Sequence, residues 1–237
     1  MKKGKSKSAK TFFAVSPFTS YFSPLTSHFF AFELFALALP SSFIISPPPM
    51  LLLSELTNVL GSAFFVFLFV VRAKQFSDSG DVIAILLAFQ SALAAFLLVM
   101  HKPVERVSHP LMSAIAWLCA LLPLALNLED ANILYSLPGL LLAVWALIVL
   151  GFSFSIAPED RGIVARGPYR LVRHPMYLGE LLSLLGLCIS AGNMWNWLAL
   201  LLFVRLLVVR IFAEERVLAD YARYRDTVRW RLIPFLW

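Results

Sequence analysis

A polar stretch rich in hydrogen-bond donors lies in the C-terminal third of the chain, between long hydrophobic segments. It spans Gly167–Gly179 and contains the run Arg-His-Pro-Met-Tyr, which begins at Arg173. A mainly apolar span follows and ends at two adjacent carboxylates, Glu214 and Glu215. Polar groups beside or inside a bilayer are costly and usually have a function. Because imidazole, guanidinium and carboxylate groups form a cluster here, the pattern indicates the site of a membrane enzyme rather than a simple anchor.

The apolar span between the polar stretch and the carboxylates is typical of a helical hairpin. We expect helices over 177–190 and 196–212, joined by the short uncharged turn Ala191–Asn196. The turn carries a tryptophan, which favours the membrane interface. An up-and-down pair of helices returns the chain to its starting face. His174 is therefore expected to meet Glu214 at one mouth of the bundle.

Arg210 and Glu214 are four residues apart on the last predicted membrane helix, so they share a helix face. The spacing alone leaves two interpretations open. The two side chains form a simple ion pair, with Arg205 snorkelling deeper in the helix, or Arg210 is part of the site.

The composition places these residues in a membrane protein. The chain has 237 residues, of which 60% are hydrophobic and 14% are charged, and its mean hydropathy is +0.80. Soluble domains are roughly 45–50% apolar and about 25% charged. One helical bundle fits this length, whereas two domains do not.

Charge and cysteine usage argue against two other classes of protein. Much of the net charge of +6 comes from five lysines within residues 1–49, and the remainder is nearly balanced. Basic residues that flank apolar spans are better explained as topology signals than as a nucleic-acid surface. Cys119 and Cys188 lie inside apolar segments without metal-ligand spacing. We therefore expect buried free thiols, no metal site and no nucleic-acid partner.

The chain divides into three parts by composition. Residues 1–49 are rich in Ser, Phe, Pro and Lys and contain no unbroken apolar run of the ~20 residues that a membrane helix needs. We expect a low-complexity extension there, disordered or dispensable, and Met50 is a possible native start. Residues 50–155 are expected to form N-terminal membrane helices. Residues 156–237 are expected to form the core that carries the site.

The predicted fold class is all-α, a polytopic transmembrane bundle with about six membrane helices from residue 50. The helices are expected near 51–71, 82–100, 111–127, 133–154, 177–190 and 196–212. Six crossings put the polar stretch and the tail on the side that carries most of the Arg residues. The positive-inside rule then predicts that the site faces the cytoplasm.

The tail after the last membrane helix has a different period. Val217, Tyr221, Tyr224 and Val228 fall on one helical stripe, and the charged residues lie mostly elsewhere. This pattern predicts a C-terminal amphipathic helix, packed on the cytoplasmic mouth or lying at the interface.

The motifs together resemble a known superfamily. The run Arg-His-Pro-Met-Tyr-Leu-Gly from Arg173, preceded by Gly-Pro-Tyr-Arg and followed by an apolar hairpin and the Glu pair, is similar to isoprenylcysteine carboxyl methyltransferases and phospholipid methyltransferases. The likeness covers about Ile163 to Pro234. These are integral membrane enzymes that use S-adenosylmethionine. The resemblance therefore implies a methyltransferase, that cofactor and a lipophilic or lipid-anchored acceptor.

The resemblance also implies roles for individual residues. Arg210 matches an arginine that contacts the acceptor, and Glu214 matches a carboxylate of the site, so these two are the expected catalytic residues. The expected cofactor-binding residues are Arg161, Gly162, Ile163, Val164, Tyr169, Arg173, His174, Pro175, Met176, Tyr177, Gly179, Glu214 and Glu215.

The chemistry of these side chains suits S-adenosylmethionine, which carries a sulfonium, an ammonium and a carboxylate. Glu214 can accept hydrogen bonds from the ammonium or the ribose, while Arg173 or His174 can meet the carboxylate or the adenine. Tyrosine rings can face the sulfonium with a cation–π contact of roughly 0.5–2 kcal/mol. Methyl transfer by direct displacement requires positioning and the exclusion of water rather than a protein nucleophile or a metal. The acceptor stays open among a carboxylate, an amine and a thiol.

Two other functions are compatible with parts of the pattern. A membrane reductase of the steroid or sterol type, which uses NADPH, has a similar Arg-His-Pro-x-Tyr-x-Gly-Glu string, and Glu180 fits it. The Glu214–Glu215 pair and the short tail favour the methyltransferase. A transporter or assembly factor is the third reading, and the sequence shows no inverted repeat in its favour.

Overall fold

The computed structural model describes most of the chain, namely residues 44–45, 48–80, 82–127 and 131–237. The expected N-terminal extension, residues 1–49, lies almost wholly outside the described residues. The proposed division of the chain at residues 50 and 156 stays a prediction.

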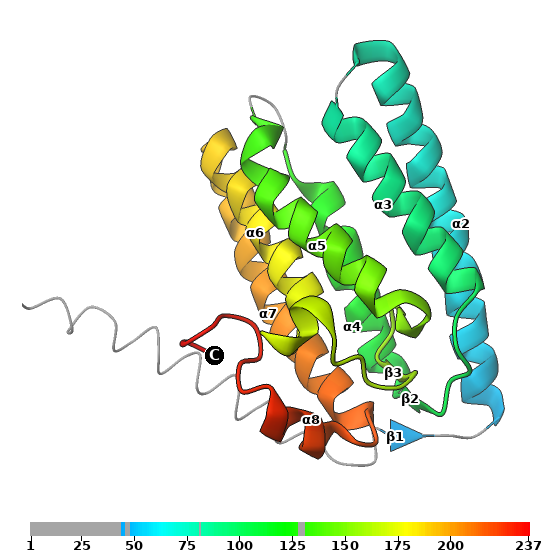
Figure 1. Ribbon diagram of the computed structural model, residues 1–237. Helices are drawn as coiled ribbons and strands as arrows, with labels where there is room; N and C mark the ends of the chain where they lie inside the picture. The colour runs from blue at the N-terminus through cyan, green and yellow to red at the C-terminus, as the bar shows by residue number, and fades with distance from the viewer. Residues whose placement is uncertain (1–43, 46–47, 81, 128–130) are drawn as a thin grey trace, which may run out of the picture. The chain divides into compact units, whose positions relative to one another are not determined.

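The described residues are mostly helical, and six apolar helices follow one another along them (Figure 1). They are α2 (Pro48–Ser79), α3 (Val82–Val99), α4 (Pro110–Leu121), α5 (Leu137–Leu150), α6 (Pro175–Ala191) and α7 (Met194–Val217). A short helix, α8 (Tyr221–Thr227), follows near the C-terminus. Helix α2 packs on α3, α5 on α6, and α7 on both α4 and α6. The predicted helical membrane bundle is confirmed.

Three of these apolar segments are long enough to cross a membrane by length and composition, Met50–Ser79, Ile133–Ser153 and Met194–Val217. Three further apolar helices within the described residues are shorter. Helix α6, at 17 residues, is about 26 Å long, against a hydrocarbon core of ~30 Å. The number of crossings therefore stays a prediction.

Several helix boundaries differ from the predicted ones for local reasons. The helix predicted over 111–127 ends as α4 at Leu121, and a 3₁₀ turn, η3 (Leu122–Ala125), contains Pro123. Proline has no N–H to continue the α-helical hydrogen bonds. The segment predicted over 133–154 is α5 flanked by 3₁₀ turns, η4 (Ile133–Ser136) and η5 (Gly151–Ser153).

The helical hairpin is confirmed, and its turn has specific caps at both ends. Helix α6 ends at Gly192, which has a φ of 61° and donates its N–H to the Cys188 carbonyl at 3.1 Å. Glycine adopts this left-handed conformation without a Cβ penalty. Asn193 then caps α7, because its side chain accepts from the Trp195 N–H at 2.8 Å. In Figure 1, α6 (yellow) and α7 (orange) run side by side.

Helices α5 and α6 approach each other at glycines. A Cβ added to Gly179 would lie 2.5 Å from the Ala143 backbone nitrogen, and one added to Gly139 would lie 2.3 Å from the Ser183 backbone nitrogen. Small residues allow such close helix packing inside membranes. This contact fixes the start of α6, where the polar stretch ends, against α5.

A small three-stranded antiparallel sheet was not predicted. It pairs β1 (Ile44–Ile45) with β2 (Arg106–Ser108) and β2 with β3 (Glu159–Asp160). Strands of two or three residues are too short for an alternating pattern to reveal them. The sheet positions Glu159 and Asp160 beside the candidate site.

The tail differs from the single amphipathic helix that we expected. Helix α7 continues through Val217, the chain is extended at Leu218, and α8 starts only at Tyr221. The apolar stripe was nevertheless informative, because Val217, Tyr224 and Val228 are all buried. The end of the chain folds back, and its backbone pairs in parallel with the polar stretch, Val172 opposite Trp230.

Candidate active site

The hairpin brings the polar stretch to the two carboxylates, but His174 contacts Glu215 rather than the expected Glu214. Tyr177, in the first turn of α6, donates its hydroxyl to Glu214 Oε2 at 2.6 Å. His174, immediately before α6, lies with its Nε2 3.2 Å from Glu215 Oε1. The His174 and Tyr177 rings stack with their centroids 5.5 Å apart. The start of α6 and the end of α7 thus form one polar site.

The two adjacent carboxylates have different surroundings. Glu214 is half-buried and lines a pocket, whereas Glu215 is 8% exposed and is surrounded by cations. Glu215 accepts hydrogen bonds from Arg173 at 3.3 Å and from Arg231 at 3.2 Å, besides its contact with His174. We infer that Glu215 holds the polar stretch in place and that Glu214 is the carboxylate available to a ligand.

Arg173 joins the polar stretch to the C-terminal tail. Its Nη1 donates to the Tyr221 hydroxyl of α8, and its Nη2 donates to the Arg229 carbonyl at 2.9 Å. Its backbone N–H donates to the Trp230 carbonyl at 2.8 Å. Its Nε is buried without a hydrogen-bond partner in the described part of the chain. One side chain therefore connects the site, α7 and the tail.

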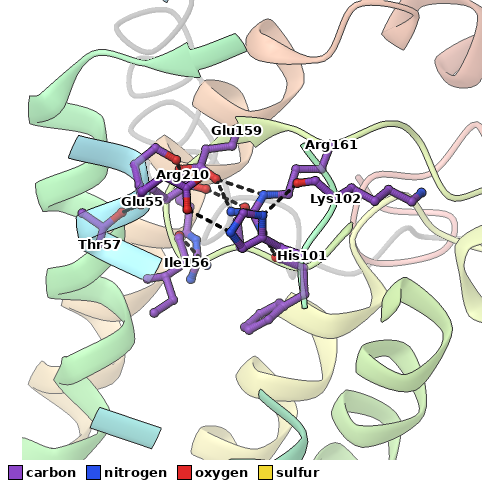
Figure 2. Close-up of polar contacts among 12 residues, drawn as sticks. Glu55, Thr57, His101, Lys102, Ile156, Glu159, Arg161 and Arg210 are labelled. Atoms are coloured by element: carbon purple, nitrogen blue, oxygen red, sulfur yellow. Dashed lines mark hydrogen bonds and ion pairs between the residues drawn. The ribbon is translucent and has the colours of Figure 1, made fainter. Parts of the chain in front are cut away.

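A buried ion pair supports the other wall of the site. Arg161 Nη2 lies 2.7 Å from Glu159 Oε2, and the two side chains are 1% and 2% exposed. Ser54 of α2 donates to the second Glu159 oxygen at 2.6 Å, and Arg161 also donates to the Phe154 carbonyl at 2.6 Å. Figure 2 shows Glu159 and Arg161 within this network, together with His101 and Glu55. Burial lowers the pKa of Arg161, and the charge of Glu159 opposes that shift.

The loop after this pair is fixed by Asp160. One oxygen of Asp160 accepts from the Gly162 N–H at 3.1 Å, and the other accepts from the Ala219 N–H at 2.9 Å. Gly162 has a φ of 83°, a conformation that favours glycine. Asp160 therefore ties the loop to the end of α7, which carries Glu214.

Arg210 lies behind the pocket rather than on its surface. It is 4% exposed and donates Nη2 to the Ile156 carbonyl at 2.9 Å (Figure 2). Its guanidinium stacks 4.7 Å from the centre of the Tyr177 ring. Its Nε has no hydrogen-bond partner in the described residues. The simple ion pair with Glu214 does not form in the described structure.

The site encloses a pocket with an empty volume of about 650 Å³, which includes its open mouth. Ten of the residues expected to bind the cofactor line this pocket: Arg161, Gly162, Ile163, Val164, Tyr169, Arg173, His174, Met176, Tyr177 and Glu214.

Four expected site residues do not line the pocket in the described structure. Pro175 is in the first turn of α6, and Gly179 packs against α5. Glu215 holds the polar stretch, and Arg210 supports the Tyr177 ring. Each of these four residues either contacts a residue of the pocket wall or holds the backbone next to such a residue. The predicted residues therefore lie together in one part of the structure.

Three tyrosines in the pocket wall lie outside the membrane helices. Burial raises the pKa of Tyr169, and the nearby charge of Glu214 raises it further. Burial likewise raises the pKa of Tyr221 and of Tyr224. All three phenols therefore stay protonated at neutral pH. The Tyr224 hydroxyl donates to the Tyr169 carbonyl at 2.7 Å, which fixes α8 against the polar stretch.

Sequence reasoning missed several lining residues. Glu159, Ser153, Ser155 and Leu150 line the pocket and precede the stretch that we had recognised. A signal existed, because Glu159, Asp160 and Arg161 form a charged cluster in the segment between two apolar helices. Across the described residues, no group of three or more His, Cys, Asp or Glu side chains could hold a metal ion.

The fold and the pocket together define a helical membrane protein with a polar site formed by the ends of two hairpin helices. Residues 130–223, which include this hairpin, match the phospholipid methyltransferase family, part of the isoprenylcysteine carboxyl methyltransferase-like superfamily. The resemblance expected from the motif is confirmed, and the match supports a membrane methyltransferase in general. Searches of curated proteins and of solved structures found no match.

Proposed function

We propose that this protein transfers a methyl group from S-adenosylmethionine to a lipophilic or membrane-associated acceptor. The observation that carries the proposal is the pocket that Tyr177 and Glu214 share with the 161–164 loop. These residues come from three separate parts of the chain, all within the family match. The match to a methyltransferase family favours this function over an NADPH-dependent reductase.

The residues of the pocket fit the proposed cofactor by their chemistry. Glu214 uses Oε2 for Tyr177, which leaves Oε1 for an ammonium or ribose hydroxyl. Arg173 has a buried Nε without a hydrogen-bond partner in the described residues, next to the pocket. Tyr169 and Tyr221, which also line the pocket, supply aromatic rings for a sulfonium. The pocket thus combines an anion, a cation and aromatic rings.

Bound in this pocket, S-adenosylmethionine would supply an electrophilic methyl group for direct displacement by the acceptor. The residues of this chain contribute position rather than covalent chemistry. Glu214 and Tyr177 hold each other, and Arg210 fixes the Tyr177 ring from behind. Burial of these groups excludes water from the pocket wall.

We propose that Arg210 lies close to the bound acceptor, on the far side of the Tyr177 ring that forms part of the pocket wall. Its guanidinium keeps one free donor, Nε, in the described structure. We also propose that the site faces the cytoplasm, because the loops on this side carry most of the arginines.

Titration of the purified protein with both candidate cofactors tests the proposal. Calorimetry in detergent should show binding of S-adenosylmethionine and no binding of NADPH. Incubation with methyl-labelled S-adenosylmethionine and a native lipid extract should then give a labelled lipid. Binding of NADPH alone would reverse the assignment in favour of the reductase.

A further inference from the structure

The C-terminal loop, residues 229–237, carries the most exposed large apolar side chain of the described chain. Phe235 is 88% exposed, and its neighbour Leu236 is 75% exposed. The Phe235 ring lies 5.3 Å from the Trp230 ring, and the Arg229 guanidinium lies 5.0 Å from the centre of the same Trp230 ring. The loop therefore presents a patch of exposed apolar side chains with a cation beside it.

The backbone at Phe235 has a conformation that bulky residues rarely adopt. Its φ is 67°, and it is the one residue other than glycine with a positive φ in the described part of the chain. Two hydrogen bonds to the Ile233 carbonyl close this turn, from the Leu236 N–H at 3.2 Å and from the Trp237 N–H at 3.1 Å. Backbone strain of this kind often marks a functional segment. In water the turn would combine strain with an exposed ring, whereas an apolar environment makes the exposed ring favourable.

The loop lies at the level of a membrane boundary. The Arg231 guanidinium and the Trp237 ring pack on the Phe212 ring of α7, at 4.7 Å and 6.2 Å, and Figure 1 shows the loop (red) beside α7 (orange). Phe212 lies about 27 Å along the helix axis from Met194, at 1.5 Å per residue, and the hydrocarbon core of a bilayer is ~30 Å thick. With Trp195 at one interface, the loop is therefore at the other.

Two cations on and beside the loop, Arg229 and Arg170, have no carboxylate partner among the described residues. Arg170 is beside the loop because Val172 pairs with Trp230, and its Nε donates to the neutral Ala165 carbonyl at 3.4 Å. Exposed arginines near a membrane surface attract anionic lipid head groups. The charge of the patch therefore complements an anionic bilayer.

The loop is also bonded directly to the candidate active site. The Arg173 N–H donates to the Trp230 carbonyl at 2.8 Å, and the His174 N–H donates to the Arg231 carbonyl at 2.9 Å. Arg231 Nε donates to both oxygens of Glu215 at 3.2 Å, and Glu215 in turn contacts His174. A movement of the loop therefore acts on the polar stretch of the site.

We propose that the C-terminal loop is an interfacial membrane anchor, which inserts Phe235 and Leu236 into the leaflet beside the candidate active site. Arg229 meets the anionic head groups of that leaflet. Insertion holds Trp230 and Arg231 in place, and these in turn keep the polar stretch ordered. A bilayer is the partner that fits this patch, because it supplies an apolar layer and negative charge at the level where the loop lies. The inference does not depend on the proposed methyl transfer.

The test attaches the environment-sensitive fluorophore NBD to Leu236→Cys in nanodiscs of phosphatidylcholine and phosphatidylglycerol. The native Cys119 and Cys188 are 0% exposed and should not react. We expect blue-shifted emission that is quenched by lipids with a nitroxide high in the acyl chain and not by aqueous iodide. NBD on Arg225→Cys, an exposed position of α8, should show the opposite pattern. Quenching of the Leu236→Cys fluorophore by iodide alone overturns the anchor.

The role of Arg229 is tested by the lipid charge. Nitroxide quenching should be stronger in nanodiscs that contain phosphatidylglycerol than in phosphatidylcholine alone, because an exposed cation favours an anionic surface. Arg229→Gln should lower that difference. Arg223→Gln, which removes another exposed charge, from α8, is the matched control and should leave the difference intact. Equal responses of the wild type and Arg229→Gln would remove Arg229 from the anchor.

The link to the site is tested by hydrogen–deuterium exchange in the same nanodiscs. Phe235→Ser with Leu236→Ser should speed exchange of the Arg173 and His174 amides by about tenfold or more, since burying one large apolar side chain is worth at least that factor. The control is Leu134→Ser with Tyr135→Ser, at positions that are 60% and 57% exposed in η4, and it should leave these amides unchanged.

The outcomes separate this inference from the proposed function. Unchanged exchange of the two amides in the Phe235→Ser, Leu236→Ser variant overturns the link between the anchor and the site. The fluorescence result stands on a chain that keeps Phe235, so it holds even where the double variant fails to fold. Neither measurement uses S-adenosylmethionine. A protein whose loop inserts but which does not bind that cofactor would contradict only the proposed function.

Discussion

Glu214 and Glu215 are neighbours in sequence, but their side chains leave α7 in different directions. Glu214 meets Tyr177 in the pocket, and Glu215 meets three cationic or imidazole side chains behind it. Successive residues of a helix point about 100° apart, which follows from 3.6 residues per turn. The pair therefore combines one carboxylate that lines the pocket with one that is held by protein side chains.

Glu214→Gln should weaken the binding of S-adenosylmethionine by about tenfold or more, since a hydrogen bond to a charged group contributes ~1.5–3 kcal/mol. The amide oxygen can still accept from Tyr177, so the fold should be retained. Isothermal titration calorimetry in detergent measures the affinity. Glu105→Gln, an exposed carboxylate outside the pocket, is the control. Wild-type affinity in Glu214→Gln would remove Glu214 from the ligand site.

Glu159→Ala should destabilise the protein by about 3–5 kcal/mol, because it leaves the Arg161 guanidinium buried without its counter-charge. Unfolding in mixed micelles of detergent and SDS gives the free energy. The double variant Glu159→Met with Arg161→Met should recover much of the loss, since it removes the unpaired charge. If the single variant unfolds like the wild type, the buried pair does not stabilise the loop.

The sequence predicted the residues of the site that lie in contiguous motifs, such as His174, Tyr177 and Glu214. They could be found because polar residues stand out against an apolar background. The Ser54–Glu159 contact could not be found, because it joins residues 105 positions apart and neither residue belongs to the motif. The different surroundings of Glu214 and Glu215 could not be predicted either, because they depend on the orientation of α7 about its own axis.

At the level of elements, the glycine contact between α5 and α6 sets the position of Tyr177. Gly179 is two residues after Tyr177 on α6, and its Cα faces the α5 backbone. The Gly139 carbonyl would lie 2.7 Å from a Cβ at position 179. Backbone atoms cannot move aside as the end of a flexible side chain can. The two helices must therefore separate to admit any side chain there.

Gly179→Ala should lower stability by roughly 1–3 kcal/mol through overpacking and should weaken cofactor binding, because Tyr177 moves with α6. The thermal unfolding midpoint in detergent and calorimetry measure the two effects. Leu182→Ala, at a position of α6 that is 40% exposed, should change neither strongly. An unchanged affinity in a destabilised Gly179→Ala would show that the helix contact does not position Tyr177.

Apolar runs predicted the existence and order of the helices, because each run is long and bounded by polar residues. They did not predict where α4 gives way to the 3₁₀ turn at Leu122 or where α7 ends at Val217. Hydropathy does not change at these points. The helix ends are decided by proline chemistry, by the extended backbone of Leu218 and by tertiary contacts of the tail.

For the whole molecule, the arrangement in the membrane is the main open prediction. The tip of the hairpin and the tail lie at opposite ends of α7, and Met194 is 73% exposed at the tip. If α7 crosses the membrane, the two ends are on different sides. The positive-inside rule predicts that the tail is on the cytoplasmic side.

Cysteine labelling in intact cells should reveal this sidedness. A membrane-impermeant maleimide should label Met194→Cys in intact cells and Arg225→Cys only after permeabilisation. The native Cys119 and Cys188 are both 0% exposed, so they should not react and the unsubstituted protein serves as the control. Labelling of both positions from the same side would contradict the crossing.

The Arg173 guanidinium couples ligand binding at the pocket to the ordering of the C-terminal segment. A ligand that favours the arrangement of Arg173 seen here also favours its bonds to Tyr221 and Arg229. Thermodynamic linkage makes this effect reciprocal. Amide protons between Tyr221 and Leu232 should accordingly exchange more slowly with deuterium when the site is filled.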